Sequence, residues 1–399
     1  MKRSVLILLG IFISYCVDVV LATTYYVNPG ESIQTAIDSA SYLDTVQVAA
    51  GTYIENITLK NGVALVGAGA ASTTIDPNDG TVIMAAGCDP NTRLSGFTIT
   101  GAAGATYGGG MSNVYSSVII TNCAFIGNSA TFGGAMRNLR SDPNVINCIF
   151  SGNSADMGGA MHNIQSSSPT ITNCTFSGNV ATNTYGGAMR NHNSTAKITN
   201  CIFWQNTAAT ADDEISNSGS TPIISHSDIA GCGGSAGWDT SFGTDGGGNI
   251  DLDPMFVLDP NAGGDGWGDD PCTPADESAN DEYGDLHLAV GSPCIDAGNN
   301  SALIANPVDP DGYPRTIDGN CDEVVVVDIG AHEFNYAYLG DFDFQCDVDY
   351  ADFAILSTVW LTDSVDLSFN ALYDISEPAD DLVDIEDAKV FVENWLQSF

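Results

Sequence analysis

The chain has 399 residues, and its 50 acidic residues against 10 basic ones give a net charge of −40. Nucleic acids and anionic membranes are bound through clustered Lys and Arg, so this charge argues against both as partners of the whole chain. The acidic residues are unevenly distributed along the chain: only 10 of the 50 precede residue 210, and the other 40 follow it. Between Gly101 and Asn206 the acidic residues are Asp142 and Asp156 alone.

The amino-terminal residues 1–22 have the features of a signal peptide. Two basic residues precede an apolar run from Val5 to Leu21, and small side chains end the run at Ala22. A membrane anchor needs about 20 uninterrupted apolar residues, and Asp18 interrupts this run. We therefore expect an exported protein, secreted or at the cell surface, with no membrane span in the mature chain.

Short apolar segments follow, and they predict that the solenoid begins before the first regular repeat. Strands are expected at 46–48, 57–59, 63–66 and 82–84. Residues 31–40 predict a short helix that is amphipathic through Ile33, Ala36 and Ile37. This helix would cap the first coil, which otherwise exposes unpaired backbone groups.

Residues 101–206 contain four copies of one pattern, Gly-Gly-x-Met followed by Asn-Cys-x-Phe-x-x-Asn. The copies begin at Gly108, Gly133, Gly158 and Gly186. A period of 25 to 28 residues is typical of a stacked solenoid, because one unit cannot bury its own apolar face. The apolar alternation slips by one residue at the Asn before each Cys, which predicts a bend there. A Gly-Asn pair predicts a second turn. We therefore predict three short strands and three turns per coil, a triangular parallel β-helix.

Equivalent cysteines would form a column inside this helix. The column contains Cys123, Cys148, Cys174 and Cys201. Neighbouring parallel strands hold Cβ atoms about 4.8 Å apart, beyond the ~3.8 Å mean of a disulfide, so we predict buried thiols. A metal or redox role is the alternative. Four later cysteines in irregular acidic sequence are better disulfide candidates with open pairing: Cys272, Cys294, Cys321 and Cys346.

A second column is a candidate ligand-binding surface. The residue after each Met is Ser112, Arg137, His162 or Arg190. Stacking would place these on an outer face at intervals of about 4.8 Å. Like charges at this spacing repel, and an anionic polymer such as a uronic or sulfated glycan would relieve the repulsion. The alternative is a row of ordinary solvated side chains.

These repeats resemble known families. Gly-Gly-Ala-Met with Phe-x-x-Asn is similar to the repeat of polymorphic outer membrane proteins, and the general form resembles the pectate-lyase-like superfamily. The resemblance implies an all-β fold, a right-handed parallel β-helix solenoid over residues 23–335, and an adhesive role. Lyases on this scaffold would need a carboxylate cluster for calcium with a nearby Arg or Lys. Glycosidases need two carboxyl groups about 5 to 9.5 Å apart.

The regular coils contain neither arrangement, since their two acidic residues lie in different turns. Other acids outside these coils stay possible as catalytic groups, although exposed acidic runs are usually solvated loops. They are Asp76, Asp79, Asp89, Asp212, Asp213 and Glu214.

Residues 226–335 form an irregular, Gly- and Asp-rich closing segment. Its motifs at 291–298, 311–315 and 328–334 resemble the closing segment of exported, surface-anchored β-helix proteins. The resemblance implies a location rather than a chemistry. We expect Ile295, Val324 to Val327 and Ile329 to complete the last coils.

The tail, residues 340–399, contains two acidic loops, each followed by a helical pattern, at a constant offset of 35 residues. The first loop places oxygen ligands at Asp341, Asp343, Gln345, Asp347, Asp349 and Asp352. The second offers Asp374, Ser376, Asp380, Leu382, Asp384 and Asp387. The spacing of the first is that of an EF-hand-like loop, which wraps a hard cation.

The paired loops resemble the dockerin module of polysaccharide-degrading assemblies. The resemblance implies a small α-helical, calcium-binding domain and a cohesin-like partner. Cys346 replaces the turn glycine of the first loop, and the second loop is two residues longer than twelve. The alternative is an acidic helical hairpin without metal.

Two functions follow. The first is an exported, monomeric, non-catalytic β-helix protein that binds polysaccharide or a surface and docks through its tail. The second is a polysaccharide lyase or glycoside hydrolase acting on acidic polysaccharides. The lack of a carboxylate cluster in the regular coils favours the first, whereas the dockerin-like tail alone favours the second.

Overall fold

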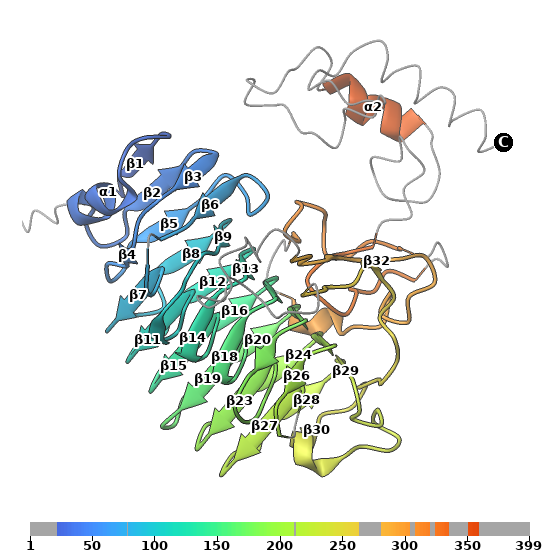
Figure 1. The fold of residues 1–399 in the computed structure, drawn as a ribbon. Helices are drawn as coiled ribbons and strands as arrows, with labels where there is room; N and C mark the ends of the chain where they lie inside the picture. Colours follow the sequence, from blue (N-terminus) through green and yellow to red (C-terminus); the bar gives the residue numbers. More distant parts are fainter. Residues whose placement is uncertain are drawn as a thin grey trace, which may run out of the picture.

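The computed structural model of the protein describes residues 22–77, 79–210, 213–262, 281–303, 308–319, 324–334 and 350–358. The chain forms a parallel β-solenoid in which successive coils stack along one axis (Figure 1). The predicted parallel β-helix is confirmed.

Four parallel sheets form the walls, and we name them A to D. Sheet A has ten strands, β1 (Thr24–Val27), β2 (Thr45–Val48), β5 (Ala64–Val66), β8 (Arg93–Ser95), β12 (Ile119–Thr121), β16 (Asn144–Ile146), β20 (Thr170–Thr172), β24 (Lys197–Thr199), β28 (Ile223–Ser225) and β30 (Thr244–Asp245). Sheet B has eight, β3 (Gly51–Tyr53), β6 (Thr73–Ile75), β9 (Thr98–Ile99), β13 (Ala124–Ile126), β17 (Ile149–Ser151), β21 (Thr175–Ser177), β25 (Ile202–Trp204) and β29 (Asp228–Ile229). Sheet C has seven, β4 (Ile57–Thr58), β7 (Ile83–Ala86), β11 (Met111–Val114), β15 (Met136–Leu139), β19 (Met161–Ile164), β23 (Met189–His192) and β27 (Ile215–Ser218). Sheet D has five, β10 (Ala105–Tyr107), β14 (Ser129–Phe132), β18 (Ser154–Met157), β22 (Val180–Ala181) and β26 (Thr207–Ala208).

The prediction of three strands per coil is wrong for the regular repeat. The first two coils have three strands, but from β10 onward sheet D adds a fourth between sheets B and C. In a regular coil this strand pairs in register, as Ala105 with Ala130 and Tyr107 with Phe132 show. Its short alternating pattern, in which Ala130 is buried and its neighbours are not, is too brief to stand out in the sequence.

The two predicted turns are confirmed. Asn122, Asn147, Asn173 and Asn200 all have φ between 50° and 55°. At the second turn Gly127, Gly152, Gly178 and Gln205 have φ between 57° and 67°. Left-handed backbone is tolerated best by Gly and Asn, which explains why the repeat retains these residue types.

The interior of the coils is a set of stacked identical side chains. Phe125, Phe150, Phe176 and Phe203 stack with ring centroids 4.4 to 5.0 Å apart. The four column cysteines are buried and free, as predicted. At the amino end, helix α1 (Ile33–Ser39) caps the first coil with Ile33 and Ile37 buried, and the Ser32 side chain accepts the Thr35 N–H.

Three ladders of asparagine side chains run along the coils. In the first, the amide of each Asn donates to the previous one, from Asn200 to Asn173, Asn147 and Asn122, at 3.0 to 3.2 Å. The second joins Asn128, Asn153, Asn179 and Asn206 at 2.8 to 3.1 Å. The third, inside sheet C, joins Asn113, Asn138, Asn163, Asn191 and Asn217 at 2.8 to 3.0 Å. These bonds satisfy polar groups that would otherwise be costly to bury.

The first part of the closing segment extends the coils, because β29 and β30 join sheets B and A. Contrary to expectation, Ile295, Val324 to Val327 and Ile329 do not complete the last coils, because the later part of the segment leaves the sheets. It folds back along the solenoid, where Asn147 donates to the carbonyl of Val308 at 2.6 Å and Ala331 donates to Thr175 at 2.9 Å. Ile329 is buried with Ile202 in a separate small core. This core includes the only antiparallel pair among the described strands, β31 (Phe256–Leu258) and β32 (Asp285–Leu288), beside the coils in Figure 1. The first Asn ladder gives the returning chain its hydrogen-bond partners, and Asn147, Asn173 and Asn200 are buried.

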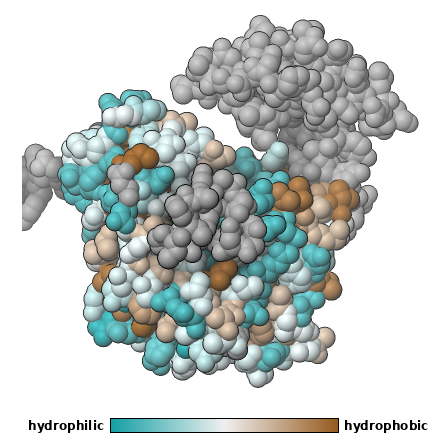
Figure 2. Space-filling view, in the orientation of Figure 1, coloured by the Kyte–Doolittle hydropathy of each residue, from teal (hydrophilic) through white to brown (hydrophobic). Residues whose placement is uncertain are grey.

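The remaining described elements are short. They are the 3-10 helices η1 (Thr240–Phe242) and η3 (Asn300–Ala302), and helix α2 (Tyr350–Thr358). None of the helices in the described ranges is long and apolar enough to cross a membrane. On the face drawn in Figure 2, hydrophobic side chains of the coils are scattered among hydrophilic ones.

Candidate functional site

The residues of the predicted ligand-binding column pair with one another on neighbouring strands of sheet C. Arg137 on β15 pairs with His162 on β19, and His162 pairs with Arg190 on β23. The column continues to Ser112 on β11 and to Ser216 on β27. The repeat therefore places an arginine on the strand before His162 and another arginine on the strand after it.

His162 is not the exposed cation that the sequence suggests. It is only 4% exposed, its ring stacks on Phe132 with centroids 5.6 Å apart, and its buried Nδ1 has no hydrogen-bond partner. Burial, together with the charges of Arg137 and Arg190, lowers the pKa of His162 to about 3. The imidazole is therefore neutral, and the positive charge of the column belongs to the two arginines.

Each arginine of the column lies over a tyrosine ring. The Arg137 guanidinium carbon is 4.2 Å from the Tyr107 ring centroid, and that of Arg190 is 5.3 Å from the Tyr185 centroid. Tyr107 and Tyr185 are 48% and 40% exposed. Burial lowers the pKa of Arg137, and no salt bridge joins Arg137 to a carboxylate within the described part of the chain. We call Tyr107, Arg137, His162, Tyr185 and Arg190 the arginine face.

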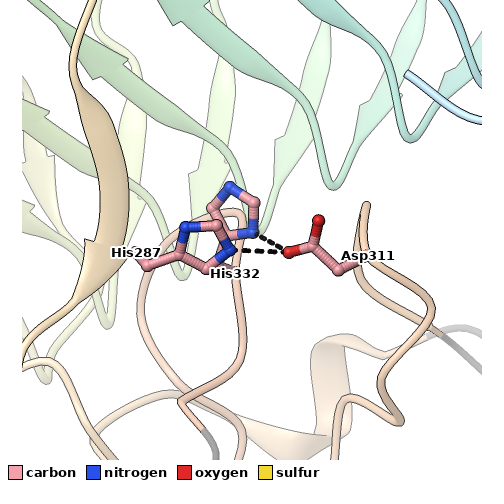
Figure 3. A group of neighbouring side chains, drawn as sticks. All are labelled: His287, Asp311 and His332. Carbon is pink, nitrogen blue, oxygen red and sulfur yellow. Dashed lines mark hydrogen bonds and ion pairs between the residues drawn. The ribbon is translucent and has the colours of Figure 1, made fainter. Parts of the chain in front are cut away.

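A second group of chemically active side chains lies in the closing segment and is absent from the sequence-based candidates. His287 on β32, Asp311 and His332 come from three separate stretches and meet at one carboxylate oxygen (Figure 3). His287 Nε2 and His332 Nδ1 each lie 2.7 Å from Asp311 Oδ2. The other ring nitrogen of His287, Nδ1, contacts the carboxylate of Asp285.

The hydrogen bonds within this group shift the pKa values of His287 and Asp311. Bonding to Asp311 and also to Asp285 raises the pKa of His287 to about 9, although burial opposes the shift. Burial would raise the pKa of Asp311, but hydrogen bonds from His287 and His332 hold it well below its usual value. The side chains of His287 and Asp311 are 45% and 31% exposed, whereas His332 is 7% exposed. The group is therefore open to solvent on one side.

A buried framework holds these residues. Asp309 accepts the backbone N–H groups of Asp311 at 3.0 Å and of Tyr313 at 2.8 Å through Oδ1, and that of Glu333 at 3.0 Å through Oδ2. One carboxylate thus fixes the turn that carries Asp311 and the residue after His332.

Arg315 completes the framework from inside. Its fully buried guanidinium donates to the carbonyls of Asp328, Gly330 and Ala331 at 2.7 to 3.0 Å. Its Nε lies 3.4 Å from Glu333 Oε2. Burial raises the pKa of Glu333 well above its usual value even beside this arginine. The backbone leading to His332 is thereby held in place.

Part of this group lies in motifs that the sequence already shows. The motifs at 311–315 and 328–334 contain Asp311, Arg315 and His332, but their resemblance implies a location for the protein and no reaction or ligand. The chain has five histidines, and only folding shows that two of them share a carboxylate.

A pocket at the carboxyl end of the regular coils contains Glu214, one of the acids that the sequence leaves possible as a catalytic group. It has a volume of about 680 Å³, and its lining includes Trp204, Asp213, Glu214 and Asp253. The sequence leaves Glu214 as either a catalytic group or part of a solvated acidic loop; it is 4% exposed and ends the second Asn ladder by accepting from Asn206. Burial raises the pKa of Glu214 to about 8.

Other sequence-based site predictions have different outcomes. Of the predicted calcium ligands only Asp352 lies within the described residues, in helix α2; the others lie outside them. Cys294, predicted as a disulfide candidate, is a buried free thiol that donates to Asp228 at 3.3 Å. Cys272, Cys321 and Cys346 lie outside the described residues.

The sequence matches no known family profile, and no curated protein is detectably similar to it. Among solved structures, pectin methylesterase from carrot matches with 14% identity over 56% of this chain and 81% of that one, at a TM-score of 0.39. Pectate lyase Pel9A matches with 12% identity over 78% of this chain and 96% of that one, at 0.36. A mannuronic acid specific family 6 polysaccharide lyase from human gut microbiota matches with 10% identity over 52% of this chain and 54% of that one, at 0.33. Conclusions about function therefore depend on the chain's own residues.

Proposed function

We propose that the protein is an exported or cell-surface β-helix protein that binds an anionic polysaccharide on its arginine face, without catalysing a reaction on it. The observation that supports this proposal is the placement of Arg137 and Arg190 two rungs apart, each over a half-exposed tyrosine ring. Two rungs correspond to roughly 9.6 Å, twice the spacing of neighbouring strands.

The chemistry of this face suits an acidic sugar chain. A guanidinium group binds carboxylate or sulfate with two parallel hydrogen bonds. A tyrosine ring offers an apolar surface for the C–H face of a sugar and a hydroxyl group for its polar edge. The strands beneath are paired on both sides, so the two arginines are held at a fixed interval before any ligand arrives, which limits the entropy lost on binding.

The test is affinity electrophoresis of the full chain through gels that contain polygalacturonate, alginate or chondroitin sulfate, with neutral dextran for comparison. Replacing both face arginines (R137S/R190S) should abolish most of the retardation by acidic glycans. The matched control is R93S/K197S, which removes two exposed positive charges from sheet A instead. Equal loss in both double variants would show that only net charge matters and would reject the arginine face.

For the tail we propose calcium binding through the two predicted loops and docking to a cohesin-like partner. The support is the ligand spacing from Asp341 to Asp352, together with the recurrence of Asp349 and Asp352 as Asp384 and Asp387, 35 residues later. Calorimetric titration of the calcium-stripped full chain should show heat, and D341N/D343N should remove the part that belongs to the first loop. A titration without heat and without gain in helicity would favour the metal-free helical hairpin.

The pocket beside Glu214 favours a second candidate, a glycoside hydrolase. A carboxyl group with a pKa of about 8 is protonated at neutral pH, as a general acid must be, and Asp253 offers a carboxylate in the same pocket. The bonds from Asn206 give Glu214 a structural role as well, so the binding protein is our first proposal. Incubation with acidic and neutral polysaccharides decides between them: new reducing ends or unsaturated products that vanish in E214Q would establish the enzyme.

A further inference from the structure

We propose that His287, Asp311 and His332 bind a divalent transition-metal ion of the zinc type. The three ligand atoms, His287 Nε2, Asp311 Oδ2 and His332 Nδ1, all lie within 4.8 Å of one another. Two imidazole nitrogens and one carboxylate oxygen form a donor set that suits zinc and neighbouring ions better than calcium or magnesium, which prefer oxygen ligands.

The geometry needs only a small adjustment to accept the ion. Each nitrogen lies 2.7 Å from Asp311 Oδ2. Ligands around a tetrahedral zinc ion at about 2.0 to 2.1 Å are roughly 3.3 Å apart, so these atoms would have to separate by about half an ångström. The half-exposed His287 and Asp311 can supply this movement, while His332 stays in its buried position.

The residues around the three ligands also support them as residues around a metal ion do. Asp285 contacts Nδ1 of His287, which leaves Nε2 of this ring for the ion. A carboxylate on the far nitrogen fixes the tautomer and orientation of a ligating histidine and strengthens its binding. Asp309 and Arg315 fix the backbone on either side, so the ligands are positioned independently of the ion.

The arrangement also indicates what bound metal would do. The three ligands come from β32, from the turn after Asp309 and from the stretch 324–334. An ion would therefore join three parts of the closing segment whose ligands lie 24 and 21 residues apart in the sequence. The exposed side of the group leaves room for water as a further ligand, as in zinc sites with three protein ligands.

The competing interpretation is a metal-free relay in which both histidines hydrogen-bond to Asp311. Zinc titration separates the two. The untagged full chain, stripped with EDTA and kept in excess calcium to occupy the tail, should bind one zinc ion that is lost in H287A, H332A and D311N. D311N is nearly isosteric and preserves the fold if one of the histidine variants does not.

The matched control is H192A/H226A, which removes two of the other three histidines and should leave zinc affinity unchanged. Asp285 is a positioning residue, so D285N should weaken zinc binding by about 10- to 100-fold without abolishing it. With labelled histidine, paramagnetic Co²⁺ should shift the signals of His287 and His332 and leave those of His192 and His226 in place. Zinc affinity that is equal in the wild type and in D311N, or Co²⁺ shifts on other histidines only, would establish the relay and overturn the proposal.

Discussion

Asn200 and Asn299 exchange two hydrogen bonds although 99 residues separate them in sequence. The Asn299 N–H donates to Asn200 Oδ1 at 2.9 Å, and the Asn200 amide donates to the carbonyl of Asn299 at 3.3 Å. The same amide also donates to Asn173 Oδ1 at 3.0 Å. One side chain thus ends the first Asn ladder and holds the closing segment against the coils.

Replacing Asn200 should loosen the closing segment selectively. Asn200→Gly keeps the left-handed backbone but leaves the Asn299 N–H without its partner. We expect the free energy of unfolding of the closing segment to fall by about 1 to 3 kcal/mol. Asn200→Ala should cost about 1 kcal/mol more because alanine disfavours positive φ. Limited proteolysis should then cut the closing segment before the coils. Asn193→Gly, at an exposed Asn that shares the left-handed backbone with φ 49°, is the control, and equal proteolysis in both would contradict the prediction.

Binding to the arginine face should be sensitive to salt but not to pH between about 5 and 8. Salt screens the exposed guanidinium groups, whereas His162, with a pKa lowered to about 3, does not change its charge in this window. A sulfated glycan should be used in the measurement because its own charge is constant. An affinity that rises steadily below pH 6.5 would show that His162 titrates on the surface after all.

Glu214→Gln should make the protein more stable at pH 8 than the wild type. The folded-state pKa of Glu214 is raised from 4.5 to about 8 by burial. Its contribution to stability is therefore complete below about pH 4.5 and is lost as the pH rises toward 8, at about 1.4 kcal/mol per pKa unit. The glutamine stays neutral and can still accept a bond from Asn206. Melting temperatures from pH 4.5 to 8.5 check this: the advantage of E214Q should grow with pH, and a constant difference would refute it.

Truncating one ring of the phenylalanine column should destabilise the regular coils strongly. Phe150 is fully buried between Phe125 and Phe176, so Phe150→Ala should cost about 3 to 5 kcal/mol. Phe132→Ala, at a half-buried position of sheet D, should cost less. The urea midpoint is the appropriate measurement, because repeat proteins need not unfold in one step. Equal midpoints for the two variants would argue against a core made of stacked rings.

The regular coils were accessible to sequence analysis because each repeats its neighbour. The slip in alternation at Asn122 and its equivalents located the bend, and the column after each Met located Arg137, His162 and Arg190 in register. Sheet D does not stand out in the sequence because β10, β14, β18 and β22 each bury only one residue, a small alanine. The neutral state of His162 was missed because its burial under Phe132 depends on the path of that fourth strand.

The sequence by itself determined the solenoid, its turns, its buried thiols and its amino-terminal cap, since each follows from local pattern and the need to bury one apolar face per coil. Only the tertiary structure decided where the closing segment goes. Its first strands, β29 and β30, extend the coils, whereas its later part hydrogen-bonds to the first Asn ladder, about 100 to 190 residues earlier in the chain. That return brings His287, Asp311 and His332 to one point, a convergence that no spacing within the sequence specifies.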